Sequence, residues 1–443
     1  MKAHISSGAI WRASYPLMLA GVGETLIDAT DVAFLAHYGV TEAGAVALAD
    51  AIYETLLVLV LGLVSGIQVV LARRVGQGSR EGVGAAFRAG LRLLLLASAL
   101  VFGLVSVAGP RLTALLVSSD GVRAAADTFL RVIVLGVGFE ALNLLLSALY
   151  VSLGRTRIVL VSTAVLVGTN VVLDYALVFG HLGCPELGIE GSAWGSAAAE
   201  VASFLVLVAY AFARGDAHTY GLFRVRGFDR TLARRITRLA TPATLELLVQ
   251  ATRWFLFFVI VEQMGELPLA ASNLVYTCLA VLVIPVEGIA ETTSSLSGRI
   301  LGEGRASRLS ALLKRSLWIG YAVGVPLALL ALAFPDRILW VFTDDPDLVE
   351  ASVAALRVAS LALLLAPAAE LLLAALEGTG DIRGTLRIEL LVGGLTLLYG
   401  ALTGLVLDQS LAIVWLFAPA AWTLTILLAL QRLRSEVWRS IEV

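Results

Sequence analysis

The chain has 443 residues, of which 59% are hydrophobic and 15% charged, and its mean hydropathy is +0.90. A soluble domain carries about 25% charged residues, so this composition excludes a soluble cytosolic enzyme, and so apolar a chain is not disordered. The formal net charge is −2, which gives no sign of a nucleic-acid partner. Cys184 and Cys278 form neither a disulfide framework nor a metal-ligand spacing.

Long apolar stretches predict an all-α integral membrane protein, because a helix needs about 20 apolar residues to cross a bilayer. A membrane β-barrel would show a period of two, which runs such as LVLVLGLV (57–64) lack. The sequence predicts twelve transmembrane helices, at residues 14–36, 48–72, 89–109, 129–150, 158–180, 191–213, 239–262, 269–298, 316–334, 351–376, 388–406 and 411–431.

The distribution of positive charge predicts that both termini are cytoplasmic. With twelve spans, 26 of the 32 Lys and Arg residues lie at or beside the termini and the even-numbered turns, and three lie beside odd-numbered turns. Positive residues concentrate on the cytoplasmic side of a membrane. The first span contains Glu24, Asp28 and Asp31, which the apolar region of a cleaved signal would not tolerate, so this span is expected in the mature protein.

An internal repeat relates the two halves of the chain. An offset of 226 residues aligns ARRVGQGSREG (72–82) with SGRILGEGRAS (297–307), and it pairs Pro16 with Pro242, Gly39 with Gly265, Gly76 with Gly302, Gly78 with Gly304, Arg88 with Lys314 and Gly154 with Gly380. We therefore expect an N-lobe (1–213), an arginine-rich cytoplasmic loop (214–238) and a C-lobe (239–443), with six helices in each of two pseudo-symmetric lobes. Such repeats are typical of secondary transporters.

The first span carries a stripe of carboxylates. Glu24, Asp28 and Asp31 are spaced by four and three residues and so share one helical face. An acid at mid-bilayer costs about 2.5–3.5 kcal/mol, and three neighbouring carboxylates cannot all stay ionised in a low dielectric. We expect either exchange of a proton or a cation site built from oxygen ligands, and a stripe that merely lines a wet vestibule is the alternative.

The fifth span offers a partner for this stripe. Asn170 and Asp174 lie four residues apart within TNVVLDYALVFG (169–180), on one helical face. Asp31 and Asp174 both lie roughly 8–9 Å below the outer ends of their spans, at about 1.5 Å per residue. Contact is therefore expected if the two helices are neighbours, and otherwise Asn170 and Asp174 form hydrogen bonds within the bundle.

The second half of the chain holds further polar candidates. Arg253 lies in the seventh span with Glu246 seven residues before it, which predicts a structural salt bridge or, alternatively, a counter-ion for the first lobe. Pro16 stands either at a helix start or at a kink. The chain has no GxxxxGK[ST] and no HExxH or Cys/His pattern, so no ATP motor, cofactor, firm metal site or enzyme activity is expected.

Several motifs in order resemble the multidrug and toxic compound extrusion (MATE) family over nearly the whole chain. They are LGRTR (153–157) opposite GTGDIRG (378–384), the paired GQG and GEG loops, NVVLDYALVFG and LGIEGSAWGSAAAE (187–200). The first-span Asp and the fifth-span Asn-x-x-x-Asp look most like the DinF-like prokaryotic branch. The resemblance implies a multi-pass transporter in the cytoplasmic (inner) membrane, in which an H+ or Na+ gradient drives export of organic cations.

The resemblance also implies roles for residues of the first lobe. Asp31 resembles the cation-coupling Asp of the branch, Asn170 and Asp174 match its fifth-helix pair, and Ser196 stands where a sixth-helix Thr is usual. Pro16 matches a first-helix proline around which bending on protonation has been proposed. A sodium ion, if one binds, is expected at Asp31, Asn170 and Asp174.

Three positions depart from the family pattern. Asp28 stands where an Asn is typical and adds a charge. Gln250 replaces a seventh-helix Glu of the NorM-like branch, and Glu370 lies near, but not at, the tenth-helix Asp of that branch. A sodium site in the second lobe is therefore not expected.

These observations favour a cation-coupled antiporter for amphipathic organic cations, driven by H+ rather than Na+. The alternative is a flippase of lipid-linked oligosaccharide or phospholipid-like cargo. Such cargo is anionic and would require a basic cavity, whereas acids outnumber arginines within the spans. A channel, a receptor and a membrane enzyme rank lower. Cationic small molecules and membrane lipids are the expected partners, and a monomer is expected.

Overall fold

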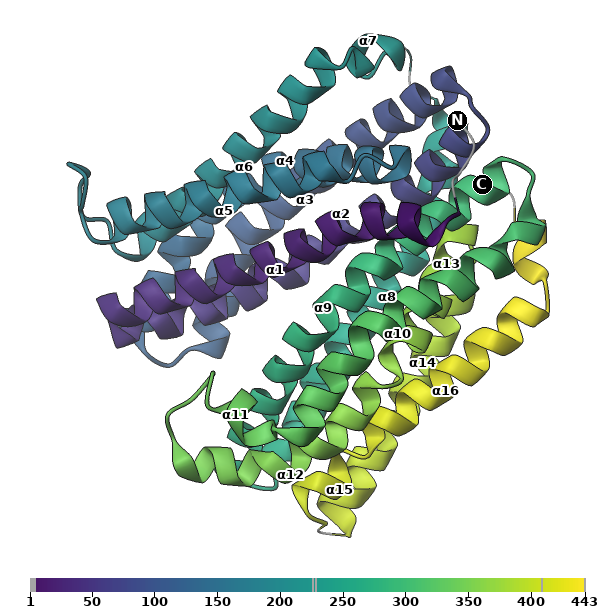
Figure 1. The fold of residues 1–443 in the computed structure, drawn as a ribbon. Helices are drawn as coiled ribbons and strands as arrows, with labels where there is room; N and C mark the ends of the chain where they lie inside the picture. The colour runs from purple at the N-terminus through teal and green to yellow at the C-terminus, as the bar shows by residue number, and fades with distance from the viewer. Residues whose placement is uncertain (1–4, 225–226, 228, 408, 442–443) are drawn as a thin grey trace. The chain divides into compact units, whose positions relative to one another are not determined.

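The computed structural model describes residues 5–224, 227, 229–407 and 409–441, whose regular structure is helical. Each predicted span coincides with one long helix or with two consecutive helices (Figure 1). The long helices are α1 Ser7–Tyr38, α2 Val40–Gly76, α3 Arg80–Leu116, α4 Asp120–Leu153, α5 Arg157–Val178, α6 Ile189–Ala213, α8 Arg230–Glu262, α9 Glu266–Gly302, α10 Leu309–Ala333, α12 Pro346–Leu363, α13 Ala366–Thr379, α14 Ile382–Ala401 and α16 Phe417–Arg434. Short helical turns join them: α7 Asp216–Thr219, η1 Ala306–Arg308, α11 Pro335–Leu339, η2 Leu402–Val406, α15 Leu411–Val414 and η3 Val437–Ser440.

Within the described residues, ten helical stretches are long and apolar enough to cross a membrane, and α12 with α13 forms an eleventh when counted as one span. These two helices meet at an angle of 47°, and Pro367 stands in the first turn of α13, where the helix must begin anew. The first predicted span is not in this set. Its helix, α1, has 32 residues, but its three carboxylates lower its hydropathy.

The helices confirm the internal repeat. α2 and α9 both have 37 residues, and their first and last residues are 226 positions apart. Gly154 and Gly380 end α4 and α13 in the left-handed conformation, with φ of 72° and 91°. A glycine is needed there because a Cβ makes this conformation costly. The repeated glycines therefore mark equivalent helix ends.

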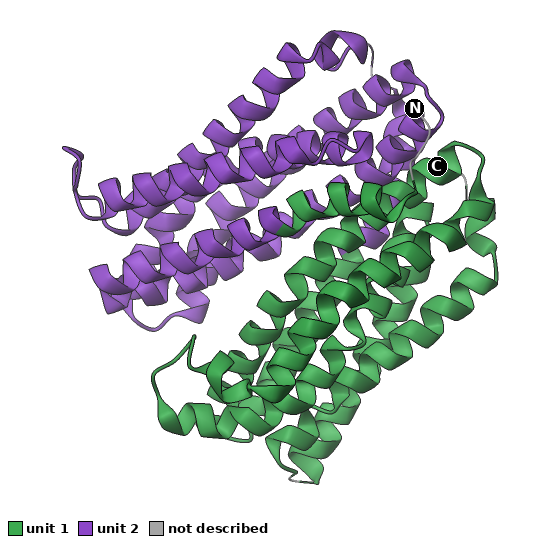
Figure 2. Ribbon diagram, in the orientation of Figure 1, with its two compact units in different colours: residues 1–18, 245–443 green, residues 19–244 purple. Residues whose placement is uncertain are grey.

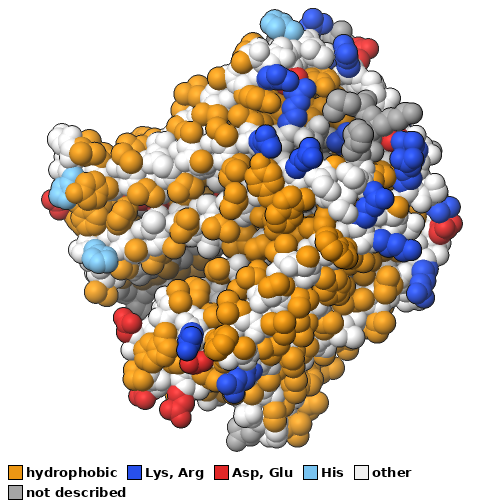
Figure 3. All heavy atoms as spheres, viewed as in Figure 1, with side chains coloured by type: hydrophobic (Ala, Val, Ile, Leu, Met, Phe, Trp, Pro, Cys, Tyr) orange, Lys and Arg blue, Asp and Glu red, His pale blue; other side chains and the backbone are white. Residues whose placement is uncertain are grey.

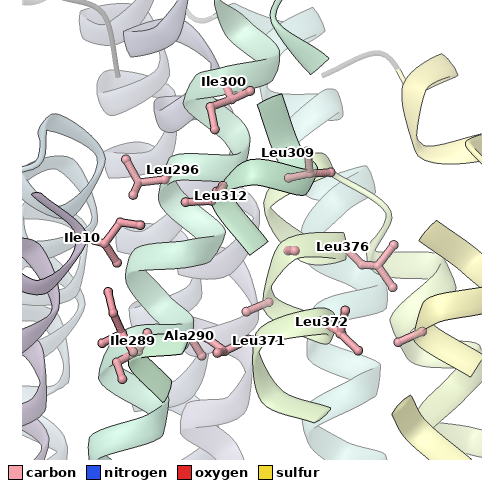
Figure 4. Packing of buried hydrophobic residues seen from close by; sticks show 14 of the residues in the cluster. Ile10, Ile289, Ala290, Leu296, Ile300, Leu309, Leu312, Leu371, Leu372 and Leu376 are labelled. Atoms are coloured by element: carbon pink, nitrogen blue, oxygen red, sulfur yellow. The ribbon is translucent and has the colours of Figure 1, made fainter. Parts of the chain in front are cut away.

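The chain divides into two compact units, coloured in Figure 2: unit 1 is Met1–Met18 with Leu245–Val443, and unit 2 is Leu19–Thr244. These limits differ from the predicted lobes, because the first turns of α1 belong to unit 1. Ile10 and Met18 pack there with residues of α9, α10 and α13, and the Arg315 guanidinium donates a hydrogen bond to the Ile5 carbonyl. Figure 4 shows Ile10 beside Ile289, Leu296 and Leu312.

The predicted cytoplasmic loop is shorter than expected, because α8 begins at Arg230 and α7 forms a turn before it. Arg155 pairs with Asp216 at 2.5 Å, and Arg88 donates to the Gly221 carbonyl at 2.6 Å. Ion pairs and hydrogen bonds therefore anchor the described part of this segment to unit 2. Along the face shown in Figure 3, hydrophobic side chains cover the helices and charged side chains lie mainly near helix ends, as expected for spans surrounded by lipid.

Candidate functional site

Unit 2 brings four predicted residues together from three helices. Ser196 on α6 donates through its hydroxyl to Asp31 Oδ2 on α1 at 3.3 Å, and Asn170 on α5 donates through Nδ2 to Ser196 Oγ at 3.1 Å. The carboxyl groups of Asp31 and Asp174 lie close enough to act on each other. The prediction that Asp31 and Asp174 can meet is therefore confirmed.

This group offers more acceptors than donors. Asn170 and Asp174 are fully buried, and Asp31 is 8% exposed. In the described part of the chain, no hydrogen bond of standard geometry reaches either oxygen of Asp174, Asp31 Oδ1 or Asn170 Oδ1. Buried oxygens without donors are costly, and a proton or a small cation would satisfy them.

A glycine allows Asp174 to occupy this position. A Cβ at Gly195 on α6 would collide with Asp174 Oδ1, and one at Gly191 would collide with the backbone of Leu177 on α5. Small residues let membrane helices approach closely. The small-residue run at the start of α6 therefore lets α5 and α6 pack closely enough for Ser196 to reach Asn170 and for Ser192 to lie beside Asp174.

The other two carboxylates of the α1 stripe lie nearer to open space. Glu24 and Asp28 are exposed, unlike Asp31. Asp28 acts electrostatically on Glu24, and Asp31 on Asp28. The stripe therefore runs from accessible to buried carboxylates within unit 2.

Two further acids of unit 2 were not singled out from the sequence. Tyr53 on α2 donates to Glu140 on α4 at 2.5 Å, and Asn143 on α4 donates to Glu200 on α6 at 2.5 Å. Glu140 and Glu200 interact electrostatically with each other and with Glu24. Their only signal in the sequence is that each is an acid inside an apolar span.

In unit 1, the predicted salt bridge between Arg253 and Glu246 is wrong. Arg253 pairs with Glu389 of α14 at 3.1 Å, and Glu246 instead accepts a hydrogen bond from the Thr385 hydroxyl at 2.7 Å. Seven helical residues separate two side chains by about 10 Å along the axis, which is too far for direct pairing.

The remaining candidates also lie on helices. Glu370 is half-buried on α13, where Glu287, Glu377 and Arg253 act on it electrostatically, and Gln250 is exposed on α8. Pro16 lies inside α1, which begins at Ser7. A helix-start role for Pro16 is therefore wrong, because the helix extends two turns before the apolar span that was used to place its start.

The described residues contain no group of three or more His, Cys, Asp or Glu side chains arranged to hold a metal ion. Asp31, Asn170, Asp174 and Ser196 are together called the Asp31 group. A cation bound there would use two carboxylates, one carboxamide and one hydroxyl. Such a site holds oxygen ligands only, which suits a proton or a hard cation.

Comparison with known proteins identifies the family of this chain. The MatE family model matches residues 16–176 and 242–420. The probable multidrug resistance protein NorM of Thermotoga maritima is 24% identical over 376 residues, which cover 83% of this chain and 78% of that protein. Its namesake in Caulobacter vibrioides is 27% identical over 346 residues, covering 76% and 71%.

Solved structures show the same fold. A structure described as the outward-facing conformation of a multidrug resistance MATE family transporter matches with a TM-score of 0.90 and 20% identity, over 98% of this chain and 97% of that chain. Because the family model also covers most of the sequence in two matching halves, the chain belongs to the MATE family of multi-pass membrane transporters.

Proposed function

We propose that this chain is an antiporter that exports amphipathic organic cations by alternating access, with H+ rather than Na+ as the coupling ion. The observation that carries the proposal is the buried pair of Asp31 and Asp174, held with Asn170 and Ser196 in unit 2. The names of the NorM relatives, which describe multidrug resistance, support drugs as cargo.

The Asp31–Asp174 pair couples the proton to the cationic drug, because the two compete for the same negative charge. Two adjacent carboxylates in a low dielectric cannot both stay charged without a bound positive ion. A bound proton makes the group less negative and weakens its attraction for a cationic drug, and a bound drug favours loss of the proton. Linkage requires the two effects to be equal in size. Exposed Glu24 and Asp28 extend the negative charge toward the accessible part of the stripe.

Two features support H+ as the coupling ion. The Ser196 hydroxyl, one of four potential ligands, already donates its proton to Asp31. In addition, the carboxyl group of Asp31 lies against that of Asp174, and two adjacent carboxyl groups can hold one proton between them. The distribution of arginines supports both termini inside, and the bacterial origin of the NorM relatives supports the cytoplasmic membrane of a prokaryote.

The proposal is tested with the purified full chain in proteoliposomes that contain ethidium. We expect an imposed pH gradient, but not a Na+ gradient, to drive ethidium transport. Asp31→Asn and Asp174→Asn should each lower the pH-driven rate by about tenfold or more, within the usual range of coupling energies.

The matched control is Asp120→Asn, because Asp120 is an exposed aspartate at the start of α4, and its rate should equal that of the unmodified chain. Thermal unfolding of each variant verifies that it is folded. Undiminished pH-driven transport by both folded site variants would refute the assignment, and transport driven by Na+ alone would refute the choice of ion.

A further inference from the structure

A second pair of carboxyl groups lies in unit 2, away from Asp31 and Asp174 in the chain. Glu140 stands on α4 and Glu200 on α6, and each has one neutral hydrogen-bond donor at 2.5 Å, Tyr53 for Glu140 and Asn143 for Glu200. Asn143 follows Glu140 by one helical turn, so the two side chains lie on the same face of α4. The bond from Asn143 therefore brings Glu200 beside Glu140, and the two acids act on each other electrostatically.

The side chain of Asn143 shows that a hydrogen-bond donor is missing beside the two acids. Its side chain is 8% exposed and directs its Nδ2 atom at Glu200. That bond fixes the orientation of the carboxamide, and Oδ1 is buried with no hydrogen bond from any described residue. A buried acceptor of this kind needs an O–H or N–H group, and a protonated carboxyl group supplies an O–H.

Among the described residues, no positively charged side chain acts on Glu140 or Glu200. The groups that act on Glu140 are Glu200 from α6, Tyr53 and Glu54 from α2, and Glu24 from α1. Those that act on Glu200 are Asn143 and Glu24, besides Glu140. All of these described groups are acidic or neutral, so the two carboxylates repel each other without a counter-ion.

We propose that Glu140 and Glu200 form a second proton-binding site of unit 2, in which the pair shares one proton and Tyr53 and Asn143 hold the two carboxyl groups in place. Glu24 joins it to the first site, because Asp31 acts on Asp28, Asp28 on Glu24, and Glu24 on Glu140 and Glu200. A role of this site in transport would rest on the proposed function, whereas proton binding by the site does not.

The test is infrared difference spectroscopy of the purified full chain between about pH 6, where exposed carboxyl groups are already ionised, and alkaline pH, which detects the C=O stretch of protonated carboxyl groups. We expect Glu200→Gln and Glu140→Gln to remove one component that Asp31→Asn leaves in place, and Asp31→Asn to remove a different component. Tyr53→Phe, which keeps both acids, should shift the component from the Glu140–Glu200 pair and leave the Asp31 component unchanged.

Glu350→Gln is the control, because Glu350 is an exposed glutamate on α12, and its spectrum should match that of the unmodified chain. Spectra of folded Glu140→Gln and Glu200→Gln identical to the unmodified chain would overturn the proposal. Loss of the component on addition of Na+ at constant pH would also overturn it, because the site would then bind a metal cation. Because no transport is measured here, the two proposals can be tested separately. The proposed antiport can be refuted while the proton site is confirmed, and the proton site can be refuted while the antiport is confirmed.

Discussion

At the scale of single residues, the Asp31 group depends on a missing side chain as much as on the polar ones. Asp174 is fully buried, and one of its oxygens occupies the space where a Cβ of Gly195 would lie. The carboxyl group therefore lies directly against the backbone of α6. Any side chain at position 195 must displace Asp174 or push α5 and α6 apart.

We accordingly expect Gly195→Ala to impair pH-driven ethidium transport in proteoliposomes and to destabilise unit 2 by about 1–3 kcal/mol, the usual cost of overpacking. Gly168→Ala is the matched control, because a Cβ at Gly168 on α5 meets nothing within 4 Å, and it should leave the transport rate unchanged. Equal rates for the two variants would show that the packing at Gly195 does not position Asp174.

Residue-scale pairing is also where prediction from the sequence was weakest. Asp31 and Asp174 were expected to meet only if their helices are neighbours, because both lie at similar depths in parallel spans. The partner of Arg253, by contrast, is Glu389 on another helix, and Glu140 and Glu200 meet through Asn143. Such pairings depend on which faces of distant helices pack together, and the spacing along one helix does not contain that information.

At the scale of helices, the apolar runs and glycines predicted the elements and their repeat well. The turns beyond the apolar core were not predicted, because interfacial helix is polar and lacks the hydropathy signal. For this reason α1 and α8 start seven and nine residues before the predicted spans. The same effect concealed that Pro16 lies within a continuous helix.

The repeated helix ends allow a paired prediction. Gly154→Ala and Gly380→Ala each place a Cβ on a residue in the left-handed conformation, which costs about 1–2 kcal/mol. We expect similar decreases in thermal stability from the two variants, because the two positions are equivalent in the repeat.

The control for this pair is Gly138→Ala in the middle of α4, where a Cβ meets nothing within 4 Å. That variant should keep or raise the stability, since alanine favours a helix over glycine by about 1 kcal/mol. If Gly138→Ala and the two helix-end variants unfold at the same temperature, the left-handed glycines are not what these helix ends require.

At the scale of the whole molecule, the composition and the repeat were sufficient for the fold class, whereas the limits of the compact units were not predictable. The first turns of α1 pack into the core of unit 1 through Ile10 and Met18. These residues are ordinary apolar residues in sequence, so only the tertiary packing distinguishes them from the rest of α1. A boundary drawn at the central loop cannot detect a helix that contributes to both units.

The orientation of the chain in the membrane is the property of the whole molecule that the arginines predict. If the even-numbered turns are cytoplasmic, Gln77 between α2 and α3 faces the cytoplasm, and Ser118 between α3 and α4 faces the outside. Both residues are exposed.

In a chain with Cys184→Ser and Cys278→Ser as the unlabelled parent, a membrane-impermeant maleimide should label Ser118→Cys in intact cells, and Gln77→Cys only after lysis. Because α3 alone separates the two positions, they must lie on opposite sides if α3 crosses the bilayer. The reverse pattern of labelling would invert the topology, and it would place the arginine-rich turns outside against the charge rule from which both cytoplasmic termini were inferred.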